Sequence, residues 1–169
     1  MEGCIIRGPF SLGEGATLKM GTKIYGATTV GPHCKVGGEV SNSILQGFSN
    51  KGHDGFMGNS VIGEWCNIGA DTNTSNLKNN YGTVKVWSYK EEKLLDSKKV
   101  FHGLVMGDHS KCGINTMFNT GTVVGVNANI FQSGFPPKHI PSFSWGTSGT
   151  VYELERSHAV ASAVCQRRD

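Results

Sequence analysis

The chain has 169 residues, enough for one domain with a hydrophobic core. Its net charge is +3 and it has only 5 Pro, so the composition favours neither a nucleic-acid-binding protein nor a disordered tract. No apolar run approaches the roughly 18 residues of a membrane span, and the first ten residues lack the basic and apolar regions of a signal peptide. We therefore expect neither a membrane nor a nucleic-acid partner.

The cysteines are widely spaced and form no CxxC pair. They are Cys4, Cys34, Cys66, Cys112 and Cys165. An odd number of scattered cysteines is typical of reduced thiols, not of a disulfide framework or a zinc knuckle. We therefore expect a cytoplasmic protein and no metal site.

Aliphatic residues recur every six positions from the start of the chain. They are Ile6, Leu12, Leu18, Ile24, Val30 and Val36. The phase slips at residues 37–43, where two extra residues are expected to bulge. It then runs through Ile44, Asn50 (an exception), Phe56, Ile62 and Ile68, and later through Met106, Cys112, Phe118, Val124 and Ile130. A helix repeats every 3.6 residues and a lone strand every two, so a period of six indicates a short strand followed by a tight turn.

Two further positions keep the same period. Glycine directly follows the apolar residue in eight hexads, and a small residue stands four positions after it in ten, Cys34 and Cys66 among them. Gly permits the unusual backbone of a corner, and a small residue fits a crowded interior. Hexapeptide repeats are a signature of the parallel β-helix, so we expect a solenoid with the aliphatic residues inside.

Residues 77–103 interrupt the repeat. They contain the alternating stretch "TVKVWSY" and the charged stretch "KEEKLLDSKK". This pattern predicts an arm that leaves the coils, and the alternative is a solvated hairpin. Because Val86, Trp87 and Tyr89 need a cover, we expect the arm to lie near a neighbouring subunit.

The Pro-rich segment "FPPKHIPSFSWG" ends the coils. Residues 150–169 then predict a helix with Leu154, Ala161, Val164 and Cys165 on one side. The expected organisation is a β-helix over 1–140, with the arm at 77–103, and a helical C-terminal extension over 141–169. Because the first hexad begins by Ile6 without a capping segment, we expect a fragment of a longer protein.

The repeat [Leu/Ile/Val]-Gly-x-x-[Ser/Thr/Ala/Cys]-x resembles the hexapeptide-repeat acyltransferase superfamily. The resemblance implies an all-β fold, a left-handed parallel β-helix with three hexads per triangular coil. This handedness is an exception to the rule of right-handed crossovers. The resemblance also implies a homotrimer with its sites between subunits.

The stretch "GHDGFMGNSVIGEWCNIGADTNTSN" is more specific. It resembles the acetyltransferase half of bifunctional N-acetylglucosamine-1-phosphate uridyltransferases. The resemblance implies that His53 is catalytic, that Asn67 and Asn76 contact substrate and neighbouring subunit, and that the Ala70 amide faces the acyl group. Gly113 falls near the coenzyme, which would be acetyl-CoA.

These residue types suit acyl transfer. An attacking amine must lose a proton, and a His side chain, which titrates near pH 6.5 when free, is the usual base. A backbone N–H stabilises the developing oxyanion, and asparagine amides bind sugar hydroxyls. No covalent intermediate is needed, so Cys34, Cys66 and Cys112 are interpreted as core residues.

The chain also departs from that family. Phe56 replaces an aromatic hydroxyl, Ser41 stands where a lysine binds the sugar phosphate, and Ile114 replaces a serine near the coenzyme. Lys51 and Arg7 are candidates for the missing cation. Asp54 is a candidate for tuning His53.

Three functions remain open from the sequence. The first is an acyl-CoA-dependent acyltransferase acting on an amino sugar phosphate or nucleotide sugar, as part of a sugar-1-phosphate nucleotidyltransferase. The second is a non-catalytic assembly or regulatory β-helix of such an enzyme, for example one like glucose-1-phosphate thymidylyltransferase. The third is a zinc hydratase, which would require His53, His102 and His109 to converge.

Overall fold

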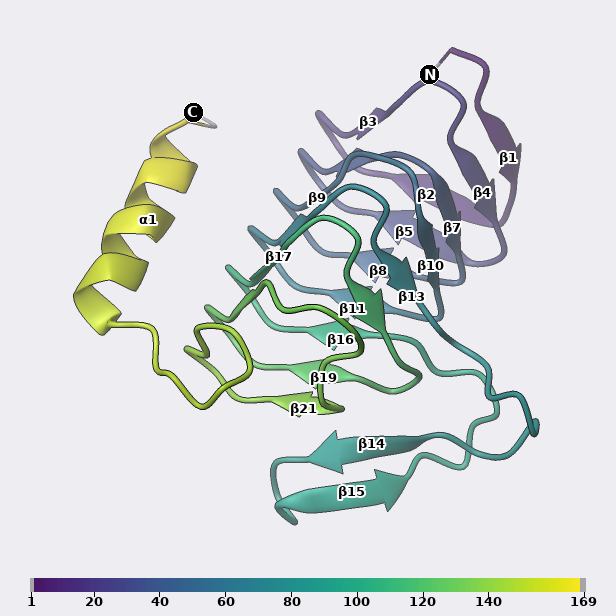
Figure 1. The fold of residues 1–169 in the computed structure, drawn as a ribbon. Coiled ribbons are helices and arrows are strands. Elements are labelled where there is room, and N and C mark those ends of the chain that lie inside the picture. The colour runs from purple at the N-terminus through teal and green to yellow at the C-terminus, as the bar shows by residue number, and fades with distance from the viewer. Residues whose placement is uncertain (1, 168–169) are drawn as a thin grey trace.

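The computed structural model describes residues 2–167, in which short strands and tight turns wind into three parallel sheets (Figure 1). Sheet A contains β1 (Ile5–Arg7), β4 (Lys23–Tyr25), β7 (Glu39–Ser41), β10 (Phe56–Gly58), β13 (Asn73–Thr74) and β18 (Met117–Phe118). Sheet B contains β2 (Phe10–Leu12), β5 (Thr28–Val30), β8 (Ile44–Leu45), β11 (Val61–Ile62), β16 (Val105–Met106), β19 (Val123–Val124) and β21 (His139–Ile140). Sheet C contains β3 (Thr17–Leu18), β6 (Lys35–Val36), β9 (Asn50–Lys51), β12 (Asn67–Ile68), β17 (Lys111–Cys112) and β20 (Asn129–Ile130). The prediction of a left-handed parallel β-helix is confirmed.

Strand pairing confirms three hexads per coil. Ile6 pairs with Ile24, and Met106 with Val124, each eighteen positions later in the same sheet. One aliphatic side chain per strand points inward, and those of Ile24, Val30, Ile62 and Ile130 are at most 1% exposed. The small residues also lie inside, since Cys34, Cys66 and Cys112 are all buried. The repeat therefore encodes a continuous core, as expected for stacked coils.

The predicted phase after the slip is wrong for three strands. Leu45, Lys51 and Met57 are the inward residues of β8, β9 and β10, each at most 1% exposed, and not Ile44, Asn50 and Phe56. The cause is a shortened coil instead of a bulge. Val30 pairs with Leu45 and Val36 with Lys51, only fifteen positions later. Because the inward residue of β9 is Lys51, the hydrophobic pattern did not indicate this shift.

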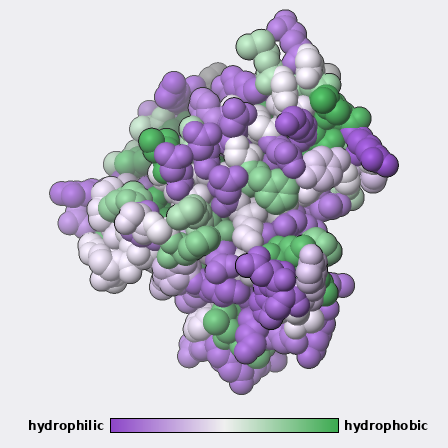
Figure 2. All heavy atoms as spheres, turned by 45° about the vertical axis from the view of Figure 1, so that its right-hand side comes forward, coloured by the Kyte–Doolittle hydropathy of each residue, from purple (hydrophilic) through white to green (hydrophobic). Residues whose placement is uncertain are grey.

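The arm forms between β13 and β16. Its strands β14 (Lys85–Ser88) and β15 (Lys93–Asp96) pair antiparallel, apart from the coils in Figure 1. Hydrophilic side chains predominate on its surface in Figure 2. Trp87 stacks on His139 of β21 with ring centroids 4.0 Å apart. The same chain thus covers part of the apolar side of the arm, and contact with a neighbouring subunit stays a prediction.

The coils run slightly past β21, because Trp145 bridges Asn129 in parallel. Helix α1 (Leu154–Gln166) follows and lies beside the coils on the side of β9 and β17 (Figure 1). Of the side predicted to be apolar, Val164 is partly buried and Leu154 is 57% exposed. The last two residues of the predicted helical segment lie outside the described residues. No helix in residues 2–167 has the length and apolar character needed to cross a bilayer.

Candidate functional site

The strand order places the turns of successive coils above one another at three corners. The C–A corner, between sheets C and A, carries residues 52–55, 69–72 and 113–116. The B–C corner carries 46–49, 63–66 and 107–110, and the A–B corner carries 42–43, 59–60 and 75–76. Residues far apart in sequence therefore meet only if they belong to the same corner or to an adjoining sheet.

One groove at the C–A corner brings together three of the predicted site residues. His53, Asn67 and Ala70 line a cavity of about 380 Å³, with Asn50 and Ile114 at its wall. His53 and Asn67 are both exposed, since His53 lies in a turn and Asn67 points outward from β12. The groove thus combines a solvent-accessible imidazole with side-chain amides, the groups expected for binding an amino sugar and deprotonating it.

Ala70 offers its backbone to the same groove. Its carbonyl accepts a hydrogen bond from the Asn115 N–H at 2.8 Å, whereas no hydrogen bond from the Ala70 N–H is found among residues 2–167. Gly113 lies behind the groove, one coil beyond Gly69, where a Cβ on Gly69 would clash with the Gly113 backbone. Gly113 therefore packs closely under the site and does not line it.

Asn76 does not join this group within one chain. It lies at the A–B corner, on the opposite side of sheet A from His53, and its Nδ2 donates to Asn59 Oδ1 at 2.7 Å. One coil earlier at the same corner, Asn42 Oδ1 accepts a hydrogen bond from the Ala27 N–H. Within the chain the role of Asn76 is to close that corner.

Lys51 supports the turn that carries His53. Its side chain fills the interior below the corner, and its Nζ donates to the carbonyls of Gly37, His53 and Asp54 at 3.2, 2.6 and 3.1 Å. Burial lowers the pKa of the Lys51 ammonium to about 8, although nearby Asp54 and Asp71 oppose the change. The backbone of the His53 turn is thus fixed by a buried cation.

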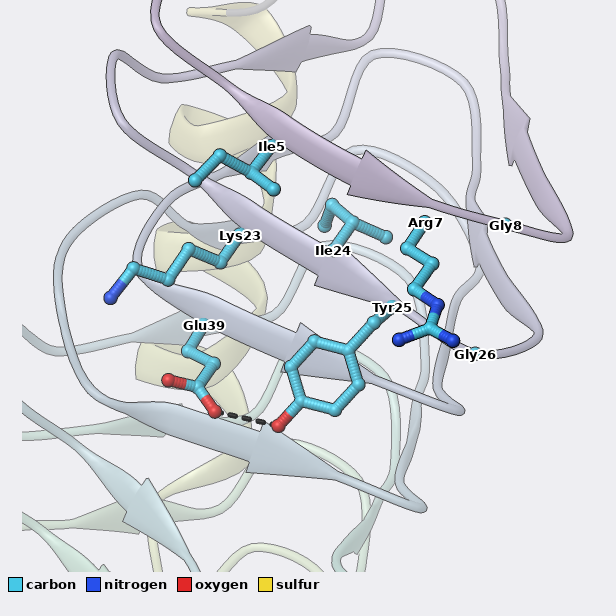
Figure 3. A pocket seen from close by; sticks show the side chains of 8 residues that line it. All are labelled: Ile5, Arg7, Gly8, Lys23, Ile24, Tyr25, Gly26 and Glu39. Atoms are coloured by element: carbon cyan, nitrogen blue, oxygen red, sulfur yellow. Dashed lines mark hydrogen bonds between the residues drawn. The ribbon is translucent and has the colours of Figure 1, made fainter.

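Within one chain neither of the two cations proposed to replace the family lysine lines the His53 groove. Lys51 is only 1% exposed, and Ser41, at the family position, is buried too. Arg7 lines a different groove on sheet A, beside the Tyr25–Glu39 hydrogen bond of 2.6 Å (Figure 3). Instead, Lys19 and Lys35 line the His53 groove. Sequence reasoning missed them because the short coil brings Lys35 beside Asn50, a pairing that the uniform period did not predict.

The three histidines required for a zinc site lie at different corners. His53 belongs to the C–A corner, His109 to the B–C corner, and His102 precedes β16 near the A–B corner. Within the described residues no three His, Cys, Asp or Glu side chains gather at a position suited to a metal ion. Within one chain these three histidines therefore do not converge on a zinc ion.

The chain resembles known proteins in sequence and in fold. Over 104 residues it is 36% identical to the bifunctional protein GlmU of Methanocaldococcus jannaschii, covering 62% of this chain and 25% of that protein. Over 121 residues it is 30% identical to GlmU of Picosynechococcus, covering 70% and 23%. No protein-family model matches the chain.

The fold resembles the crystal structure of the polySia-specific acetyltransferase NeuO, with a TM-score of 0.52. The match covers 96% of this chain and 95% of that one at 12% identity, so it supports the fold alone. The chain spans about a quarter of the length of the GlmU proteins it matches. The resemblance found in the sequence, a hexapeptide-repeat β-helix like the acetyltransferase part of such bifunctional enzymes, is confirmed.

Proposed function

We propose that this chain is an acyl-CoA-dependent acetyltransferase domain acting on an amino sugar phosphate or a nucleotide sugar. The observation that carries the proposal is the single groove lined by His53, Asn67 and Ala70. The similarity to GlmU proteins supports a transferase with acetyl-CoA as the acyl donor. The parent protein is proposed to be a cytoplasmic sugar-1-phosphate nucleotidyltransferase.

Each groove residue has a role in the proposed reaction. The amine nitrogen attacks the thioester carbonyl while the imidazole of His53 accepts the amine proton. The Ala70 N–H donates to the oxyanion that develops on that carbonyl, and Asn67 holds a sugar hydroxyl. The carbon–sulfur bond then breaks, and the protonated His53 returns a proton to the departing thiolate. No group in this sequence of steps requires a metal or a covalent enzyme intermediate.

A homotrimer is part of the proposal, because Asn76 lies away from His53 in the same chain. A neighbouring copy would have to supply its Asn76 to complete the site. The outward face of sheet B supports packing of copies, since Ile44, Val61 and Val105 stand side by side on it. Ile44 is 45% exposed and Val61 37%, so this row is available in the single chain.

The second candidate function is the assembly or regulatory domain. One observation favours it: the family position for the phosphate-binding lysine is a buried serine, Ser41. A domain that only assembles the parent enzyme would need no phosphate clamp. The presence of Lys19 and Lys35 in the groove opposes it, because they supply cations by another route.

The test is acetyl transfer from acetyl-CoA to a panel of hexosamine phosphates and nucleotide-linked amino sugars, followed by release of free thiol. The variant His53→Ala should lower turnover by about 10² to 10⁴, the usual contribution of a general base. His53 is exposed and makes its bond to Lys51 through its backbone carbonyl, so the fold should be kept.

The matched control is His158→Ala, an exposed histidine of α1 that does not line the groove, which should keep full turnover. The molar mass of each variant by light scattering should equal that of the wild type. Undiminished turnover in His53→Ala would contradict the assignment of the base. Absence of transfer to every acceptor, together with absence of acetyl-CoA binding by calorimetry, would favour the assembly domain.

A further inference from the structure

The His53 groove continues across sheet C into a second groove. The second cavity, of about 350 Å³, shares Lys35, Asn50 and Asn67 with the first. These three side chains and Lys111 form one outward row, because Lys35 pairs with Asn50, Asn50 with Asn67, and Asn67 with Lys111. The two cavities are therefore halves of one trough, which has His53 and Ala70 at one end.

The trough is strongly cationic. Lys19 and Lys35 line the first half, and Lys35, Lys111 and Arg167 line the second, whereas no Asp or Glu lines either half. Lys111 is partly buried, and its Nζ donates to the His109 carbonyl at 3.0 Å. Burial lowers the pKa of this ammonium. A partly desolvated cation flanked by exposed cations favours an anionic ligand.

Aromatic side chains form the end of the trough opposite His53. Phe48 and Trp65 line it, and their parallel rings stack with centroids 4.2 Å apart. His33 stacks on Phe48 and His109 on Trp65, so the ring edges are the part left for a ligand. Both residues have positive φ, 52° and 59°, which is unusual for bulky side chains. Val164 of α1 and Arg167, directly after the helix, form the facing wall. Ring edges and a planar guanidinium suit the face of a nucleic-acid base.

We propose that this trough binds a nucleoside diphosphate sugar as the acetyl acceptor, with the amino sugar at His53, the diphosphate along Lys35 and Lys111, and the base between Trp65 and Arg167. This inference rests on the proposed function and selects one of its two acceptor classes. Phe48 and His53 are five residues apart, at most about 18 Å of extended chain. A base, ribose, diphosphate and sugar in series suit such a span, whereas a lone sugar phosphate would leave the aromatic end empty.

Binding is tested without acyl transfer, by calorimetry of the full chain with UDP, dTDP, UMP, glucosamine-1-phosphate, inorganic phosphate and desulfo-CoA. One of the two diphosphates should bind at least tenfold more tightly than inorganic phosphate and than glucosamine-1-phosphate. Loss of one charge-assisted contact should weaken it about tenfold or more in Lys35→Gln and in Lys111→Gln. The matched control is Lys23→Gln, an exposed lysine on sheet A, which should bind it unchanged. Lys111 is partly buried, so its substitution also changes packing. Lys35 is exposed, and Lys35→Gln is therefore the decisive variant.

Equal affinity for phosphate and for both diphosphates would overturn the inference, because the aromatic end would then be unused. Binding of desulfo-CoA alone, with its affinity reduced in Lys35→Gln, would also overturn it and assign the trough to the acyl donor. Nucleotide binding without any acetyl transfer would support the trough as a nucleotide site but refute its role in holding an acetyl acceptor, together with the proposed function. Transfer to a hexosamine phosphate without nucleotide binding would refute this inference and leave the proposed function standing.

Discussion

The turn at residues 113–116 and the turn at residues 52–55 occupy the same corner of the β-helix but are held together differently. In the first, the buried Thr116 donates through Oγ1 to the Gly113 carbonyl at 2.8 Å. In the second, Gly55 stands in place of the threonine, and a Cβ there would clash with the Thr72 carbonyl. Lys51 instead donates from the interior to the carbonyls of His53 and Asp54. One turn is closed locally, and the other depends on a buried charge.

The irregular spacing of the coils coincides with the candidate site. Where a small residue closes each corner, coils keep eighteen positions, as from Cys112 to Ile130. Around the His53 turn the spacing falls to fifteen between Val36 and Lys51. The shorter coil leaves the Gly37 carbonyl below the corner, and Lys51 binds this group as well. The turn that carries the proposed base is thus the one with the most specialised support.

The largest expected effect in this comparison is that of Lys51→Ala. Truncation would leave a cavity in the core and remove the donor of three carbonyls. The free energy of unfolding should fall by about 3 kcal/mol or more, as for large-to-small core substitutions. Urea denaturation at one fixed protein concentration measures it.

Lys51→Met separates the two causes, because methionine restores most of the volume without the donor. Amide exchange at residues 52–55 should be faster in Lys51→Met than in the wild type, while exchange at 113–116 should not change. If amide exchange at residues 52–55 were as slow in Lys51→Met as in the wild type, Lys51 would only fill space.

The pH dependence of stability gives a smaller effect. The pKa of Lys51 is lowered from 10.5 to about 8 in the folded chain, so between these values the unfolded chain holds a proton that the folded chain has lost. Unfolding then takes up a proton, and the contribution of Lys51 to stability rises with pH across this window. Cys66, whose pKa burial raises to about 12, acts in the opposite direction.

The measurement is therefore the difference between wild type and Lys51→Met, in which the contribution of Cys66 cancels. The stability of the wild type relative to the variant should increase from about pH 8 to about pH 10.5, between the pKa of Lys51 in the folded chain and that in the unfolded chain. A constant difference over that range would contradict a lowered pKa for Lys51.

The features that a local sequence pattern encodes could be predicted from the sequence. Each hexad carries its own inward residue, glycine and small residue, so the fold and the burial of Cys34, Cys66 and Cys112 followed from single repeats. A local motif also placed His53, Asn67 and Ala70 together. Contacts that depend on coil length were not predictable, because the row of Lys35 and Asn50 and the inward position of Lys51 arise from a shortened coil.

The smallest expected effect belongs to the regular turn. Thr116→Val removes the hydroxyl that closes residues 113–116 and keeps the shape of the side chain. Because the Gly113 carbonyl also accepts from Thr72 Oγ1 at 3.3 Å, it keeps one donor after the substitution. The loss should be about 1 kcal/mol, the net value of one hydrogen bond, and clearly less than for Lys51→Ala. A matched substitution is Thr22→Val, whose hydroxyl donates to the Lys19 carbonyl at 2.6 Å in the first coils. A loss in Thr116→Val as large as that in Lys51→Ala would mean that both turns depend equally on their donors, and the contrast between them would fail.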